Sequence, residues 1–444
     1  MLNLAAPLAL AELGWVAMGV VDTMMAGRLG AAAVGAGSLG GILFYPIAAW
    51  GTGILLGMDT LVAQAFGAKN QPDCRRTLVN GIWLALGMSP LLGAVIWSIP
   101  SLLRVLGTNP HVMLLLVPFL KAFTWSIAPL FLFTAFRRYA QAVDIVKPVT
   151  FALVSANIVN FVGDWVLMYG HWGAPAMGLE GSGWSTTLAR TYMAGVLLAA
   201  IVWHEHKTGN LLFYLSWRPD LARIRRLVAL GLPAAAQFAL EGAVFGAVAV
   251  LAARLDEASL AAHSIAVQVI SATYMVPLGI SSAAAVRVGH AVGRKDRQGV
   301  AASGWAALVL SVMFMGAAGA AFWIVPRWIV GIFIDDRGVV GIGAVLLRIA
   351  AFFELFDGVQ VVATGALRGL GDTRSPMLAH FAGYWIIGLP VAYVLCFPLG
   401  WGAAGIWVGL CAALIPIGAA LVLVWRSQVA GTDGKRGRRT AQLF

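Results

Sequence analysis

The sequence predicts an all-α protein that crosses a lipid bilayer many times. Apolar residues make up 60% of the 444 residues, charged residues make up 11%, and the mean hydropathy is +0.85. This composition excludes a soluble globular protein, because it supplies too few charged side chains to cover one. The run LALGM at residues 84–88 does not alternate polar and apolar residues, as the strands of an outer-membrane barrel would. We therefore expect a bundle of membrane-spanning helices.

Apolar stretches of roughly 20 residues, the length that spans a bilayer as a helix, lie between charged or proline- and glycine-marked breaks. Twelve such helices are expected, at about 3–25, 35–65, 78–98, 113–138, 148–169, 177–203, 226–252, 259–290, 300–325, 338–367, 376–397 and 402–426.

The basic residues predict the orientation of these helices. A net charge of +11 could suggest a nucleic-acid partner, but in a membrane protein the distribution of the charge matters more. Most Lys and Arg follow the second, fourth, sixth, eighth and tenth helices or lie in the tail, and the other breaks hold only Arg28, Arg104, Arg254, Arg327 and Arg337. By the positive-inside rule both termini are cytoplasmic. We expect the basic tail to fix topology as a disordered end, with nucleic-acid or lipid binding as the alternative.

The chain also repeats itself. Pro7, Arg28, Leu29, Gly53, Gly67 and Lys69 recur 226 positions later as Pro233, Arg254, Leu255, Gly279, Gly293 and Lys295. Each half then holds six helices and enters the membrane from the same side, so the repeat is parallel, with a cavity expected between the two lobes. The expected organisation is an N-lobe at 1–205, a cytoplasmic linker at 206–225, a C-lobe at 226–426 and a basic tail at 427–444.

Acidic residues inside the apolar stretches are the strongest functional signal. A carboxylate at the centre of a bilayer costs about 2.5–3.5 kcal/mol, so such groups usually face a cavity and bind ions, protons or charged substrate. The residues concerned are Glu12, Asp22, Asp59, Asp164, Glu241, Glu354 and Asp357. Glu12 and Asp59 are the weaker candidates, and Asp59 is expected near a helix end in contact with solvent.

Four motifs carry a family resemblance. They are VDTMMAGRLG at 21–30, NIVNFVGD at 157–164, LAAH at 260–263 and DGVQVVATGALRG at 357–369. Together they resemble the multidrug and toxic compound extrusion (MATE) family, in its NorM-like bacterial branch, over essentially the whole chain. The resemblance implies two six-helix lobes that rock between inward and outward states in the cell inner membrane. It also implies that Na⁺ or H⁺ entering down its gradient drives organic, often cationic, drugs out. Relatives usually have a polar, basic segment before the first helix, so we expect the true start of the chain to lie upstream.

In the N-lobe, Asn160 and Asp164 are four residues apart, so they share one face of a helix. With Asp22 they would form an oxygen-rich cluster that can hold Na⁺ or a proton. The resemblance implies this same site and adds Thr186. For Asn160 alone, a helix–helix hydrogen bond worth about 0.6 kcal/mol is the alternative. Asn157 is a weaker member of the same region.

In the C-lobe, the resemblance implies that Glu241 and Asp357 form a site for the coupling ion or the substrate, with Na⁺ as one candidate ligand. Glu354 lies one turn before Asp357 and outside the family pattern, so it either interacts with Asp357 or forms part of the cavity wall. Pro7 removes a backbone hydrogen bond from the first helix and is either a hinge, as the resemblance implies, or a static kink.

Other classes of protein fit the sequence less well. A lipid-linked oligosaccharide flippase of the wider superfamily is the main alternative, but its cavity is expected to be basic, and here bases such as Arg190 are few. An enzyme is not expected, because the 7 histidines are dispersed. The 3 cysteines have no metal-site spacing. The protein is expected to work as a monomer without an organic cofactor, while its substrates and the choice between Na⁺ and H⁺ stay open.

Overall fold

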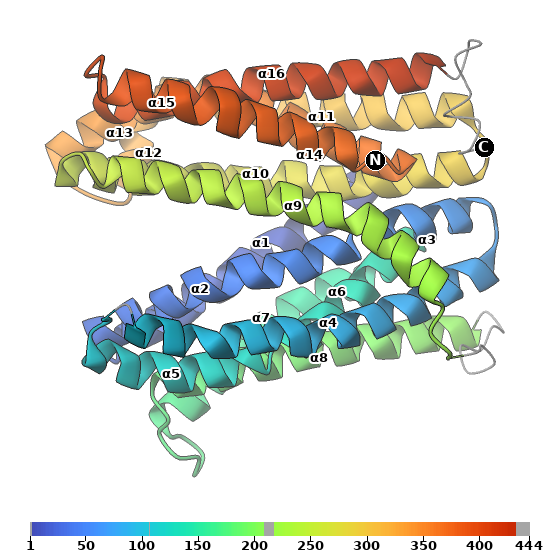
Figure 1. The fold of residues 1–444 in the computed structure, drawn as a ribbon, viewed down its shortest axis with the longest axis horizontal. Helices are drawn as coiled ribbons and strands as arrows, with labels where there is room; N and C mark the ends of the chain where they lie inside the picture. The colour runs from blue at the N-terminus through green and yellow to red at the C-terminus, as the bar shows by residue number, and fades with distance from the viewer. Residues whose placement is uncertain (1, 106, 208–216, 432–444) are drawn as a thin grey trace. The chain divides into compact units, whose positions relative to one another are not determined.

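The computed structural model describes residues 2–105, 107–207 and 217–431, and these residues are almost entirely helical (Figure 1). The first half of the chain forms α1 (Leu2–Gly27), α2 (Ala31–Leu55), α3 (Gly57–Gly67), α4 (Gln71–Val105), α5 (Pro110–Thr124), α6 (Ile127–Ala142), α7 (Lys147–Tyr169) and α8 (Leu179–Lys207). The second half forms α9 (Leu221–Ala252), α10 (Glu257–Gly293), α11 (Arg297–Ile324), α12 (Pro326–Gly331), α13 (Arg337–Leu370), α14 (Arg374–His380), the π-helix η2 (Phe381–Gly388), α15 (Leu389–Cys396) and α16 (Gly402–Gly431).

The number of membrane spans agrees with the sequence. Eleven helical segments of the described residues are long and apolar enough to cross a bilayer, and α5 with α6 makes a twelfth that bends by 41° at its break. All twelve expected stretches are therefore present, and the fold is two sets of six spans related by a parallel repeat. The repeat is not perfect in detail. The second expected helix is broken at Leu56, whereas its counterpart α10 runs unbroken through Pro277.

The chain folds into two compact units. One unit, called the N-unit here, is Leu10–Ala235, and the other, the C-unit, is Met1–Ala9 together with Ala236–Phe444. Both boundaries lie inside long helices, two residues after the repeat-related prolines Pro7 and Pro233. The domain limits expected from the sequence stay a prediction, and residues 208–216 of the linker and 432–444 of the basic tail lie outside the described residues.

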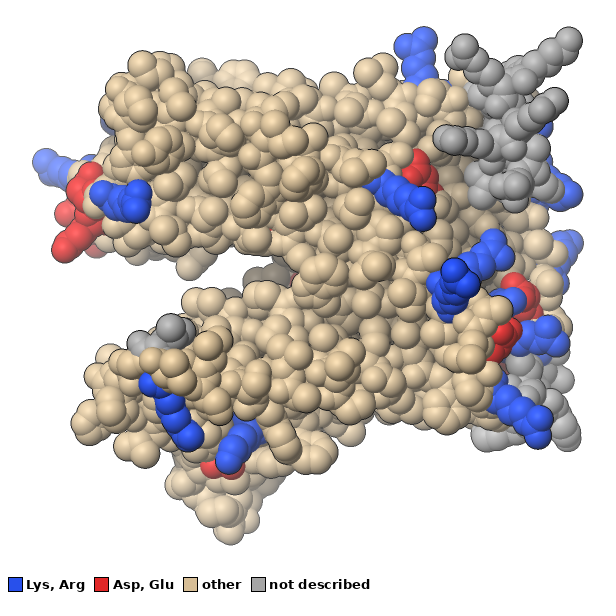
Figure 2. All heavy atoms as spheres, viewed as in Figure 1, with Lys and Arg blue, Asp and Glu red and all other residues tan. Residues whose placement is uncertain are grey.

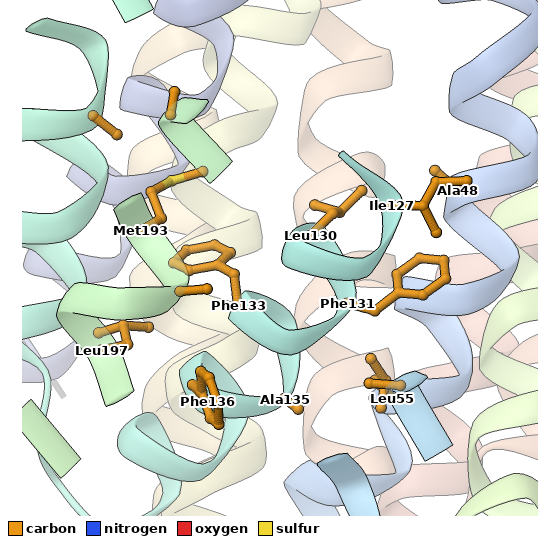
Figure 3. Close-up of a cluster of buried hydrophobic side chains, with 14 of the residues drawn as sticks. Ala48, Leu55, Ile127, Leu130, Phe131, Phe133, Ala135, Phe136, Met193 and Leu197 are labelled. Carbon is orange, nitrogen blue, oxygen red and sulfur yellow. The ribbon is translucent and has the colours of Figure 1, made fainter. Parts of the chain in front are cut away.

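The core of the N-unit shows how the helices pack. Aromatic and aliphatic side chains of α6 fill the space between α2 and α8 (Figure 3). Phe131 lies against Gly51 of α2, where an added Cβ would stand 2.1 Å from the Phe131 ring. Ala48, Leu55 and Met193 complete the contact from the two neighbouring helices. The small residue lets α2 approach the ring, which is typical of helix packing in lipid, where close van der Waals contact replaces hydrophobic burial.

Charged side chains lie mainly near the ends of the helices. On the face drawn in Figure 2, the surface along the middle of the helices consists of uncharged residues, and Lys and Arg gather close to the helix ends. This pattern is the one that a bilayer requires, since the hydrocarbon region cannot solvate an exposed charge.

Candidate functional site

Three helices of the N-unit bring its expected site residues together. Asp22 comes from α1, Asn160 and Asp164 from α7, and Thr186 from α8. The Thr186 hydroxyl lies 3.5 Å from Oδ2 of Asp22, and Asp22 interacts electrostatically with Asp164. Asn160 and Asp164 are both fully buried and share the inner face of α7, as their spacing indicates. The helices thus assemble a cluster of oxygen atoms inside the unit.

The oxygens of this cluster are mostly unpaired. Among the described residues, neither carboxylate oxygen of Asp164 has a hydrogen-bond partner, and Oδ1 of Asp22 and Oδ1 of Asn160 also lack one. A buried carboxylate without partners is costly, because nothing replaces the water that solvated it. A bound cation or a proton would remove that cost. This donor set, made of oxygens alone, fits a hard cation as well as a proton.

Two serines of α8 belong to this site, although sequence reasoning missed them. The Ser185 hydroxyl donates to the backbone carbonyl of Asn160 at 2.7 Å and accepts from the Asn160 amide at 3.4 Å. The Ser182 backbone carbonyl accepts from the Thr186 hydroxyl at 3.0 Å, and the side chains of Ser182 and Ser185 interact with Asp164. Ser185 and Thr186 follow Ser182 by three and four residues, which places all three on one face of α8. This spacing is the signal that could have identified the serines.

A cavity of about 480 Å³ opens beside the cluster within the N-unit. Asp22, Ser182 and Thr186 supply polar groups to its wall, and Tyr45 and Phe123 are among its aromatic residues. A cavity of this size and mixed lining is typical of sites for small organic molecules.

Arg190 of α8 is buried next to Phe123, one of the residues that line this cavity. Its guanidinium donates to the Ser126 hydroxyl at 2.6 Å and stands over the rings of Phe44 and Phe123, at 5.1 and 4.8 Å from their centroids. It also interacts electrostatically with Asp22. The base is therefore held by aromatic rings and by the hydroxyls of Ser126 and Tyr45, an arrangement in which cation–π attraction replaces part of its hydration.

Two other candidates, Asn157 of α7 and Pro7 of α1, lie outside this cluster. The Asn157 amide donates to the carbonyls of Gly14 and Leu153, so it joins α7 to α1 outside the acidic cluster. Pro7 stands inside α1 next to the boundary of the two units, which fits a hinge or a kink alike.

Glu12 and Asp59 form ion pairs with bases of α6. Glu12 pairs with Arg137, and Oδ2 of Asp59 lies 3.6 Å from the Arg138 guanidinium. Asp59 is 2% exposed in the first turn of α3, so the expectation that it contacts solvent was wrong. The arginines stabilise the buried carboxylates, and both acids hold the α1, α3 and α6 segments together instead of joining the cluster around Asp164.

The C-unit holds a second acidic cluster. Glu241 of α9 and Glu354 and Asp357 of α13 are all buried, and Asp357 interacts electrostatically with each of the other two. Glu241 Oε2 and both carboxylate oxygens of Glu354 have no hydrogen-bond partner among the described residues. Glu354 therefore lies beside the pair implied by the resemblance. The Tyr384 hydroxyl, from the π-helical segment η2, is unpaired as well and interacts with Glu241.

Polar side chains that the sequence did not single out extend this cluster. Asp357 Oδ1 accepts from the Gln360 amide nitrogen at 3.0 Å, and the Gln360 amide oxygen lies 2.6 Å from Nε2 of His380. The Gln237 amide lies 3.3 Å from the same ring nitrogen. The position of Gln360, one turn after Asp357, could have been noticed, whereas His380 lies on another helix and gave no signal.

Metal-binding geometry is limited. Within the ranges that the structure describes, no group of three or more His, Cys, Asp and Glu side chains is arranged to hold a metal ion. The expected Na⁺ sites would rely on two carboxylates each, completed by amide, hydroxyl or carbonyl oxygens, and they stay predictions.

Two six-span lobes, each with unpaired buried carboxyl groups among the described residues, define the chain as a polytopic α-helical membrane protein. The family model MatE matches residues 7–166 and 233–394. The chain belongs to this family.

Curated relatives support the same assignment. The chain is 36% identical to "Probable multidrug resistance protein NorM" of Mesorhizobium japonicum over 431 residues, 96% of this chain and 92% of the relative. It is 37% identical to the protein of the same name from Bradyrhizobium diazoefficiens, over 96% and 92% of the two chains. Two solved structures share the fold. The eukaryotic MATE transporter AtDTX14 has a TM-score of 0.82 at 18% identity and coverage of 97% and 96%. The outward-facing structure of a multidrug resistance MATE family transporter has a TM-score of 0.87 at 17% identity and coverage of 98% and 96%.

Proposed function

We propose that the protein is a secondary active multidrug exporter. It removes organic, often cationic, compounds from the cell in exchange for Na⁺ or H⁺. Family membership and the similarity to proteins named multidrug resistance protein NorM support the class of substrate. The observation that carries the coupling is Asp164, which is fully buried with both carboxylate oxygens unpaired among the described residues. Such a group is stable in a membrane when it binds a cation or a proton and unstable when empty, which is what an exchanger needs.

The N-unit cavity supports cationic aromatic substrates. Asp22 supplies an acidic group on its wall, and Phe119, Phe123 and Tyr45 supply aromatic faces. A flat organic cation gains both from attraction to the carboxylate and from stacking on the rings. Because Asp22 also belongs to the coupling cluster, substrate and coupling ion would compete for the same carboxylate.

The transport cycle follows from the repeat. We propose that the two lobes rock between inward and outward states, with Pro7 as a hinge in α1. The protein works as a monomer in the inner membrane with both termini in the cytoplasm. The C-unit acids Glu241 and Asp357 act in the cycle as a site for the coupling ion or the substrate, and Glu354 modulates them.

Ethidium efflux from proteoliposomes tests this proposal. Efflux should need an imposed proton or Na⁺ gradient and should proceed without ATP. A protonophore should stop it if H⁺ is the coupling ion, and withdrawal of Na⁺ should stop it if Na⁺ is. Efflux indifferent to both treatments would refute ion-coupled export. Movement of a lipid-linked oligosaccharide without ethidium transport would favour the flippase alternative.

A further inference from the structure

A line of buried side chains joins α14 to the acidic cluster of the C-unit. His380 is 0% exposed, and its Nδ1 lies 2.7 Å from the backbone carbonyl of Pro376. Its Nε2 lies 2.6 Å from the amide oxygen of Gln360, whose amide nitrogen lies 3.0 Å from Oδ1 of Asp357. Gln360 is also 0% exposed and Asp357 is 5% exposed, so all three residues of the line are buried.

The hydrogen-bonding chemistry of these atoms restricts where protons can be. A carbonyl only accepts, so the Nδ1 of His380 must donate to Pro376 and carries a hydrogen. In a neutral imidazole Nε2 is then an acceptor. An acceptor 2.6 Å from the Gln360 oxygen, a second acceptor, would be repelled. Either Nε2 of His380 therefore carries an additional proton, or the Gln360 amide is rotated so that its nitrogen faces Nε2.

Two arrangements satisfy every atom in the line. In the first, His380 is an imidazolium that donates from Nε2 to the Gln360 oxygen, and the Gln360 nitrogen donates to an ionised Asp357. In the second, the Gln360 amide is rotated by 180°, so that its oxygen and nitrogen exchange positions. Its nitrogen then donates to a neutral His380, and its oxygen accepts from a protonated Asp357. Both arrangements contain the same number of protons.

We propose that His380 is the proton partner of Asp357, with Gln360 as the link between them. This inference deepens the proposed function and rests on it for its role in transport. Between the two arrangements the N–H bond at Nε2 of His380 is broken and an O–H bond at Oδ1 of Asp357 is formed. The net charge of the pair is zero in both, so Asp357 can ionise inside the lobe without leaving an uncompensated charge in a low-dielectric region. His380 is a positioning residue for this carboxyl group.

Other titratable groups face this line from the neighbouring elements. Tyr384 of η2 stands with its ring centroid 5.8 Å from that of His380. Glu241 of α9 and Glu354 of α13 interact with Asp357, and Tyr274 of α10 interacts with Tyr384.

Residues of α9 and α16 also lie near His380. The Gln237 amide of α9 lies 3.3 Å from Nε2 and can turn to suit either arrangement. From α16, Ala413 and Ile417 approach Gly383, three residues after His380. None of the neighbours named above is a lysine or an arginine, so we take the imidazole of His380 as the cationic partner of Asp357.

Infrared difference spectroscopy of the full-length protein in liposomes tests the inference directly. A pH titration follows the carbonyl band of protonated carboxyl groups, and the contribution of Asp357 is identified by its loss in Asp357→Asn. In His380→Gln, which keeps hydrogen bonding but cannot become a cation, the midpoint of the Asp357 band should rise by about one pH unit, because an opposite charge has been removed. Gln360→Leu should give the same rise by cutting the link. The pH profile of efflux should move in the same direction.

His263→Gln is the matched control. His263 is buried in the same unit, where it accepts from the Trp407 indole at 3.2 Å, and the line to Asp357 does not include it. An unchanged Asp357 midpoint in both His380→Gln and Gln360→Leu would overturn the inference, and so would an equal rise in His263→Gln. Should one variant fail to fold, the other decides the question. The spectroscopic measurement does not depend on transport. Efflux by the wild-type protein without ion dependence would therefore refute the proposed function alone. An unchanged midpoint of the Asp357 band would refute only the role of His380 as proton partner.

Discussion

Asp164 and Asp22 belong to different helices of the N-unit and interact within one cluster. Asp164 has 0% exposure, while Asp22 lies on the wall of a cavity. Asp164 therefore lies inside the cluster, whereas Asp22 faces the cavity. Under the proposed function both carboxyl groups belong to one ion site, and Asp22 is also the one that faces a substrate in the cavity.

We predict that Asp164→Asn and Asp22→Asn each abolish ion-coupled efflux while the amount of protein in the membrane stays unchanged. Removing a charge from a membrane segment does not hinder insertion, and the amide keeps the volume of the carboxyl group. Ethidium efflux and a membrane immunoblot measure the two effects. Glu180→Gln, at the start of α8, is the control, since its carboxylate accepts from the Trp184 indole at 3.3 Å and is not a member of the acidic cluster. Wild-type efflux in both Asp variants would reduce the cluster to structural packing.

The C-unit cluster should act as one group. Glu241→Gln and Asp357→Asn should each shift the pH or cation dependence of efflux, and the double variant should be little worse than the poorer single variant. Glu354→Gln should have a smaller effect, although its burial beside Asp357 makes it part of the same cluster. Efflux measured over a pH series gives the answer. Additive losses with an unchanged profile would show that these acids serve folding or substrate attraction.

At the scale of the elements, α10 and α13 pack extensively against each other in the C-unit. Gly365 of α13 faces the backbone of α10, and an added Cβ would stand 2.3 Å from the carbonyl oxygen of Ser281. The Ser281 hydroxyl also donates to the backbone carbonyl of Val361 at 2.8 Å, which ties the two helices together. Backbone atoms cannot move aside as a flexible side chain can. The pair α10 and α13 carries Asp357, so its spacing also positions the C-unit acids.

We predict that Gly365→Ala destabilises the protein by about 1–3 kcal/mol, the usual cost of overpacking. Gly316→Ala on α11 is the matched control, because nothing lies within 4 Å of its added Cβ. It should be neutral or slightly stabilising, since alanine favours a helix more than glycine does. Thermal unfolding in detergent, followed by the loss of monodisperse protein, compares the two. Equal stability of both variants would contradict the close packing.

At the scale of the whole molecule, the even number of spans sets the topology. The odd and even breaks between spans lie on opposite sides of the bilayer, and the basic residues favour the even breaks. Gln298, at the start of α11, and Asp335, between α12 and α13, are both exposed and are separated by a single span. These two positions therefore report the orientation directly.

We predict that a membrane-impermeant maleimide labels Asp335→Cys on intact cells and labels Gln298→Cys only after the cells are permeabilised. Of the three native cysteines, Cys74 and Cys396 are buried and Cys411 lies partly buried inside the span α16, so they should give little background. Labelling of both positions from the outside would contradict the single span between them, and the reverse order would place the termini outside the cell.

Much of the architecture follows from the sequence alone. Apolar stretches long enough for a bilayer determined the twelve spans, and the recurrence of Pro7 as Pro233 with its companions determined the two sixfold halves. The spacing of Asn160 and Asp164 determined that they share a face, because the helical period is a local property. These features depend on residues near one another in the chain or on direct comparison of its halves.

Only the tertiary structure decided which distant side chains meet. Glu12 and Asp59 have the same sequence signature as Asp164, yet Arg137 and Arg138 reach the first two while Asp164 keeps both carboxylate oxygens unpaired among the described residues. Ser185 next to Asn160, and the line from His380 to the C-unit acids, likewise join residues of separate helices. Hydrogen bonds and ion pairs act over a few ångströms, and the rotation and spacing of packed helices, which the local pattern does not specify, decide whether two such groups come that close.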